Sequence, residues 1–160
     1  LEDIEQAVTT FARRAAERIR SESLAASCIS VFIRTNPFDK KSTYYSNGAS
    51  KTLSHPTHDS ITIIETALSI TKKIFKKNYQ YKKAGVLISG LCDESEIQET
   101  LFEKNYNLNS DLMSAIDTIN YRYGRDTLQM ASECKVGNWK QKRESCTRNY
   151  TTQIDRLLLV

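Results

Sequence analysis

The chain has 160 residues, of which 39% are hydrophobic and 9% aromatic, and its formal net charge is +4. These values suit one ordinary domain or two small ones with a core, and they exclude wholesale disorder. No apolar run approaches the ~20 residues of a membrane span, and no signal peptide opens the sequence, so we expect a cytoplasmic protein without a membrane partner.

The charge is unevenly distributed along the chain. Residues 1–91 carry 14 Lys and Arg against 8 Asp and Glu, residues 92–110 carry 1 against 5, and residues 111–160 carry 8 against 6. Two basic modules therefore flank an acidic connector. Basic surfaces attract phosphate backbones or acidic proteins, whereas an acidic connector repels nucleic acid.

The first segment is predicted to be a helix. Its apolar side chains recur at spacings of three and four residues, which places them on one face: Ile4, Val8, Phe11, Ala15 and Ile19. From Ile29 the pattern changes to alternation, with Val31 and Ile33 on the same side as Ile29. This alternation predicts a strand that is covered on one face.

The rest of the first module, residues 1–91, follows from turn and cap signals. Asn36-Pro37 ends the strand, because proline has no amide hydrogen to donate. A second strand is predicted from Tyr44 to Leu53, a helix from Thr57 or Asp59 to about Asn78, and a third strand from Ala84 to Leu91. The predicted order is α-β-β-α-β, and the expected fold class is α+β.

An acidic linker is predicted over residues 92–109, and a small, mostly helical C-terminal module over residues 110–160. Ser110 is expected to cap a helix that Gly124 ends. Its expected apolar face consists of Leu112, Ala115, Ile116, Ile119 and Tyr123. A short strand is expected from Asp126 to Ala131.

Four sequence blocks carry a resemblance to a known family. They are residues 31–38, 44–50, 56–59 and 139–152. In this order they resemble the little finger and following C-terminal region of the UmuC-like Y-family translesion DNA polymerases. The resemblance implies a β-α-β-β-α-β little finger that lacks its first strand here. An incomplete sheet has an exposed edge, which could pair with a second copy in a strand-exchange homodimer.

The resemblance also implies that the sheet face left open by the helices binds primer-template DNA. Basic and hydroxyl side chains would contact phosphates without reading the base sequence, and a glycine would let the backbone approach them closely. The candidate DNA-binding residues are Arg34, Ser46, Ser50, Lys51, Thr52, Lys82, Lys83 and Gly85. Charge alone leaves open a solvated face without a partner, or a face that docks an acidic protein. The basic residues of the helices are expected to keep the surface soluble instead: Arg13, Arg14, Lys72, Lys73, Lys76 and Lys77.

The linker contains a short motif in which Gln98 is followed by Leu101-Phe102. It is similar to the peptide by which bacterial polymerases bind the β sliding clamp. Two adjacent apolar side chains could fill a preformed pocket while Gln98 hydrogen-bonds its rim. The alternative is one helical turn that packs against a domain.

The C-terminal tail resembles the region that UmuC-like proteins carry after the little finger, with Gln141 and Thr147-Arg148 as departures from the usual pattern. The resemblance implies accessory-protein binding, to the UmuD′ dimer and the RecA filament. The candidate residues are Trp139, Lys142, Arg143 and Tyr150. The alternative is that Trp139 and the nearby tyrosine anchor the tail on the protein itself.

The sequence lacks the features of a catalytic site. A polymerase holds two metal ions ~4 Å apart with clustered carboxylates, whereas Asp111 and Asp117 are expected to face solvent on a helix. The four cysteines and two histidines lack zinc-ligand spacing. We expect a non-catalytic region without a metal or cofactor of its own, whose parent polymerase would use Mg²⁺. RNA binding by base stacking is disfavoured, since Phe32 is the one aromatic candidate on a central strand.

Overall fold

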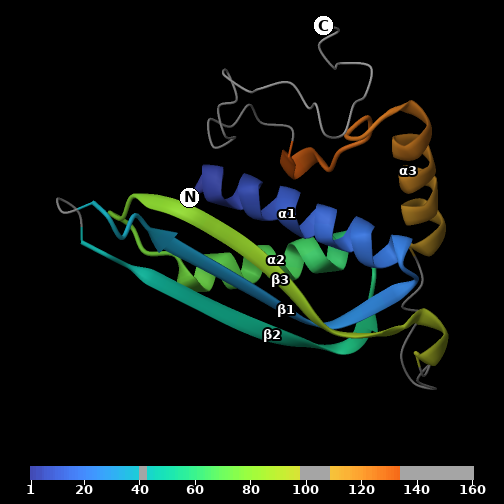
Figure 1. The fold of residues 1–160 in the computed structure, drawn as a ribbon, viewed down its shortest axis with the longest axis horizontal. Helices are drawn as coiled ribbons and strands as arrows, with labels where there is room; N and C mark the ends of the chain where they lie inside the picture. The colour runs from blue at the N-terminus through green and yellow to red at the C-terminus, as the bar shows by residue number, and fades with distance from the viewer. Residues whose placement is uncertain (40–42, 98–108, 134–160) are drawn as a thin grey trace, which may run out of the picture.

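The computed structural model describes residues 1–39, 43–97 and 109–133 (Figure 1). The order of elements is α1 (Glu2–Ser21), β1 (Leu24–Thr35), β2 (Ser46–Thr57), α2 (Ser60–Ile74), β3 (Tyr81–Asp93) and α3 (Ser110–Tyr123). Short 3₁₀ helices follow β3 at Glu94–Glu96 and α3 at Ala131–Glu133. The α+β fold class and the α-β-β-α-β order of the first module are confirmed.

The described residues form one three-stranded antiparallel sheet in the order β2-β1-β3. Helices α1 and α2 lie side by side against the same face of this sheet (Figure 1). Ile29, Val31 and Ile33 of β1 point into the core, where they meet the apolar faces of both helices. The alternation read from the sequence therefore identified the covered face correctly.

The predicted ends of several elements are wrong. Strands β2 and β3 reach beyond Leu53 and Leu91, because each continues to pair with β1 along its length. Helix α2 ends at Ile74 and not near Asn78, since Phe75 is already extended and Asn78 has a positive φ of 70°. Its cap is Asp59, one of the two predicted residues.

The C-terminal helix is confirmed, but its packing differs from the prediction. Gly124 ends α3 with a φ of 109°, while Asn109 and not Ser110 holds the N-cap position. Leu112 and Tyr123 of the predicted apolar face are exposed. The buried positions are Met113 and Asn120.

The strand expected at Asp126–Ala131 does not form. The Asn120 side chain makes the backbone hydrogen bonds that a neighbouring strand would make. Its Oδ1 accepts from the Leu128 backbone N–H at 2.8 Å, and its Nδ2 donates to the Leu128 carbonyl at 3.2 Å. The segment is thereby folded back onto α3.

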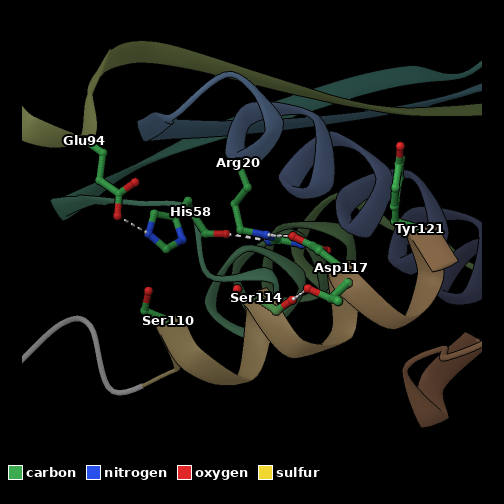
Figure 2. A pocket seen from close by; sticks show the side chains of 8 residues that line it. Arg20, His58, Glu94, Ser110, Ser114, Asp117 and Tyr121 are labelled. Carbon is green, nitrogen blue, oxygen red and sulfur yellow. Dashed lines mark hydrogen bonds and ion pairs between the residues drawn. The ribbon is translucent and has the colours of Figure 1, made fainter.

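Two arginines of α1 hold this C-terminal part against the first module. Near the C-terminal end of α1, Arg20 forms a bidentate pair with Asp117 at 2.7 and 2.9 Å (Figure 2). Two turns earlier, Arg13 pairs with Glu133 at 2.7 Å and with Asp126. Arg13 is only 4% exposed, so the expectation of a solubilising surface residue is wrong for it, as is that of a solvent-facing Asp117.

A polar pocket of about 460 Å³ lies at the same junction. Figure 2 shows Arg20 and Asp117 in it, beside the pair between His58 Nε2 and Glu94 Oε1 at 3.0 Å. Arg20 Nη1 also donates to the His58 carbonyl and to Ser60 Oγ, both at 2.8 Å. The arginine therefore ties α3 to the start of α2 as well as to α1.

Candidate nucleic-acid interface

The face of the sheet opposite the helices, here called the open face, is built by alternation along β1. Since Ile29, Val31 and Ile33 are buried, the residues between them point outward. The pairing register extends them into four cross-strand rows: Thr52–Cys28–Ser89, Ser50–Ser30–Leu87, Gly48–Phe32–Gly85 and Ser46–Arg34–Lys83. None of these twelve residues is acidic.

The structure brings most of the candidate DNA-binding residues together on this face. The six that belong to its rows are Arg34, Ser46, Ser50, Thr52, Lys83 and Gly85. Lys51 pairs with Ile29 and so belongs to the other face, although it is exposed on the edge strand β2. Lys82 falls in the irregularity between two pairs, Arg34 with Lys83 and Thr35 with Tyr81, and it is exposed.

The open face is graded from polar to basic. At one end hydroxyls predominate, and Ser30 Oγ lies 2.8 Å from Ser50 Oγ across the strands. At the other end Arg34 and Lys83 face each other, with Lys82 next in the chain. Such a surface offers hydrogen-bond donors and positive charge to an anionic backbone.

Gly85 has a use that the sequence did not indicate. A Cβ atom at this position would lie 2.4 Å from both Cε1 and Cζ of Phe32. The ring of Phe32 therefore occupies the space above Gly85 that an approaching phosphate was expected to use. Contact between Gly85 and DNA stays a prediction.

An aromatic cluster holds the loops beside the basic end, and sequence reasoning missed it. Tyr45 and Tyr79 lie with ring centroids 4.8 Å apart, and Phe75 and Tyr81 with centroids 5.4 Å apart. Tyr45 also donates to the Ile74 carbonyl at 2.8 Å. The pairs Tyr44-Tyr45 and Tyr79–Tyr81 were the available signal.

The same cluster positions positive charge. Lys76 Nζ lies 5.0 Å from the centroid of the Tyr45 ring, a cation–π arrangement. The Thr35 backbone N–H donates to the Tyr45 carbonyl at 2.9 Å, which fixes the end of β1 just after Arg34. The loops therefore support the basic row of the open face.

The remaining candidate residues lie outside the described residues. These are Gln98, Leu101 and Phe102 for the clamp, and Trp139, Lys142, Arg143 and Tyr150 for accessory proteins. Within the described ranges no group of three or more His, Cys, Asp or Glu could hold a metal ion. Among the described helices, none has the length and apolar character to cross a membrane.

Comparison with known proteins gives two adjacent domain matches. Residues 1–101 match the impB/mucB/samB family C-terminal domain. Residues 110–160 match a domain of unknown function, DUF4113. The boundary between the matches falls within the predicted linker.

Several curated proteins are similar over nearly the whole chain. The UmuC protein of Salmonella typhimurium is 37% identical over 99% of this chain and 38% of its own length. The MucB protein of Escherichia coli is 38% identical over 95% of the chain and 36% of its own length. The ImpB protein of Salmonella typhimurium is 35% identical over 92% and 35%. The chain thus spans little more than a third of the length of these relatives.

Proposed function

Because the chain belongs to the impB/mucB/samB family, whose C-terminal domain it carries, we propose that it grips DNA and tethers partners for an error-prone translesion DNA polymerase. The resemblance to the Y-family little finger supports the assignment to a polymerase. The proposed roles of the connector and the tail rest on their sequences. In this proposal the region positions DNA and performs no chemistry itself.

The observation that carries the proposal is the composition of the open face. Its rows place Arg34, Lys83 and five hydroxyl side chains on one surface without an acidic residue among them. This surface suits a sequence-independent contact with phosphates, which positions a duplex without specifying bases. The helices α1 and α2 cover the other face, where their apolar side chains and those of the sheet form the hydrophobic core.

Partner binding forms the second half of the proposal. The motif at Gln98, Leu101 and Phe102 would dock on the β sliding clamp, and the tail around Trp139 would bind the accessory proteins, the UmuD′ dimer and the RecA filament. The parent polymerase would hold its catalytic Mg²⁺ ions with carboxylates of another part of the chain. The free edge of β3 within the described sheet is consistent with the strand-exchange homodimer, which stays a prediction.

A second candidate function is a protein-interaction domain whose basic face docks an acidic protein. The same charges favour it, since an acidic surface also complements Arg34 and Lys83. Competition separates the two functions. If the face binds DNA, unlabelled duplex DNA should displace a labelled primer-template, whereas an acidic polypeptide of equal charge should not.

The test is the affinity for a labelled primer-template, measured by fluorescence anisotropy over a series of salt concentrations. Arg34→Ala/Lys83→Ala should weaken binding and lower the slope of log affinity against log salt by up to ~1.8, since each lost phosphate contact contributes ~0.9. Lys72→Ala/Lys73→Ala on α2 removes the same charge from the opposite side of the sheet and is the matched control. Absence of binding at low salt, or equal effects of both double variants, would contradict the proposal.

A further inference from the structure

Phe32 occupies the centre of the open face, where an exposed aromatic side chain stands among polar neighbours. It is 42% exposed, although the side chains before and after it on β1 are buried. Its partner is a glycine on both neighbouring strands, Gly48 on β2 and Gly85 on β3. Across this row the Phe32 ring is the one side chain that stands above the backbone.

The two glycines determine how the ring lies. A Cβ on Gly85 would meet Cε1 and Cζ of the ring at 2.4 Å, so the ring is laid over the backbone of β3. A Cβ on Gly48 would meet Phe32 Cβ at 3.3 Å, so the other side of the row is also close. The ring therefore lies along the sheet, with one side against glycine and the other toward solvent.

The surroundings of the ring indicate a ligand in which apolar and anionic groups alternate. One neighbouring row is basic, with Arg34 and Lys83, and the other contains the Ser30–Ser50 hydrogen bond. Leu87, two residues after Gly85 on the same face, is 60% exposed and extends the apolar area diagonally. In a nucleic-acid backbone the apolar face of each sugar lies between two phosphates.

We propose that the Phe32 ring packs against a deoxyribose of the duplex held on the open face, and that Gly85 is required to present the ring. This inference rests on the proposed function and deepens it, because it adds a salt-independent contact to a grip otherwise made by charge. Phosphates would bind the basic row while the adjacent sugar covers the ring.

Phe32→Ala should weaken duplex binding roughly tenfold, as expected for the loss of one partly buried aromatic contact. The salt slope should stay unchanged, since no phosphate contact is removed. Arg34→Ala should also weaken binding, but it should lower the slope. These two readouts separate the apolar contact from the ionic one in the same titration.

Gly85→Ala gives an independent test, because it adds one methyl group and removes nothing that could touch DNA. It should weaken binding by displacing the ring. In the Phe32→Ala background the same change should have no further effect, so the double-mutant cycle should be non-additive. Tyr121→Ala on α3, where the side chain is 94% exposed, is the control for loss of a surface aromatic. Circular dichroism confirms that each variant is folded; if Gly85→Ala is not, the Phe32→Ala salt series still decides.

The outcomes distinguish this inference from the function on which it rests. If the wild-type chain does not bind duplex DNA, both fall. If Arg34→Ala weakens binding and Phe32→Ala does not, the inference alone is overturned. A loss seen with single-stranded DNA but not with duplex would also overturn it, because the ring would then be stacking on a base.

Discussion

Asp59 links the first turn of α2 to the residue before α3 through one carboxylate. It accepts the backbone N–H groups of Ile61 at 3.1 Å and Thr62 at 3.0 Å, and Asn109 Nδ2 at 3.3 Å. Asp59→Ala should lower the free energy of unfolding by ~1–2 kcal/mol, the usual cost of losing an N-cap. Urea unfolding measures it. Asp59→Asn retains a capping oxygen and is the control; an equal loss in both variants would show that the cap itself contributes nothing.

The same carboxylate makes stability depend on pH. Burial raises the pKa of Asp59, but the hydrogen bonds from Thr62, Ile61 and Asn109 outweigh burial and hold the pKa below its ordinary value of 3.8. A depressed folded-state pKa contributes stability that is present above the unfolded value and lost as the pH falls through the folded one. The urea midpoint of the wild type should therefore fall more between pH 5 and pH 3 than that of Asp59→Asn. This range of ~2 pH units brackets the reference pKa of an aspartate. Parallel pH curves for the two proteins would contradict this.

Among the elements, the docking of the segment after α3 on α1 depends on Arg13. Burial lowers the pKa of Arg13, but the hydrogen bonds and charges of Glu133 and Asp126 outweigh it, so the guanidinium stays charged. Arg13→Ala would leave the buried Glu133 carboxylate without its cation, a change that costs ~3–5 kcal/mol when a buried pair is broken.

We expect this cost to appear as local undocking, since the sheet core does not include Glu133. Hydrogen exchange should show faster exchange of α3 amides and of residues 126–133 in Arg13→Ala, while β1 stays protected. Arg14→Ala is the matched control, because Arg14 is largely exposed and lies 3.5 Å from Asp126. Unchanged exchange in Arg13→Ala would mean that the Arg20–Asp117 pair and the buried Met113 suffice to hold the contact.

The sequence was sufficient for those features of the elements that depend on local periodicity. Alternation of Ile29, Val31 and Ile33 revealed the covered face of β1, and with it the outward direction of Arg34. The ends of β2 and β3 could not be read, because they are set by the partner strand. The row Gly48–Phe32–Gly85 requires a pairing register, which no local pattern contains.

Long-range contacts explain the other errors. Arg13 and Glu133 are 120 residues apart, so nothing near Arg13 marks it as buried. The apolar residues of α3 fall on more than one side of the helix, and only its tertiary packing decides that Met113 is buried and Leu112 exposed. The role of Asn120 could not be predicted from the sequence, because its partner Leu128 lies beyond the end of α3, after a turn.

At the scale of the whole molecule, the open face and α3 are separate surfaces. The open face is the face of the sheet that α1 and α2 leave uncovered. Helix α3 lies beside the C-terminal end of α1 (Figure 1), where Arg20 pairs with Asp117, and the segment after α3 pairs with Arg13. DNA bound on the open face would therefore not cover α3. If the DNA grip and the proposed tether bind at the same time, each raises the effective concentration of the other's partner.

Simultaneous binding of DNA and clamp makes a prediction about the clamp motif. Burial of Leu101 and Phe102 in the proposed clamp pocket would contribute ~1.5–3 kcal/mol each before ordering costs, so binding to an isolated clamp should be near micromolar. On DNA loaded with a clamp, the DNA grip should strengthen the complex further through effective concentration.

Leu101→Ala/Phe102→Ala should abolish binding to the isolated β sliding clamp, measured by surface plasmon resonance, and leave the affinity for naked primer-template unchanged. Glu99→Ala/Thr100→Ala alters the two residues between the fixed positions and is the control. If the Leu101/Phe102 variant keeps its clamp affinity, the motif is an ordinary packing turn and the tether must lie elsewhere; if it loses DNA affinity as well, the two surfaces are not independent.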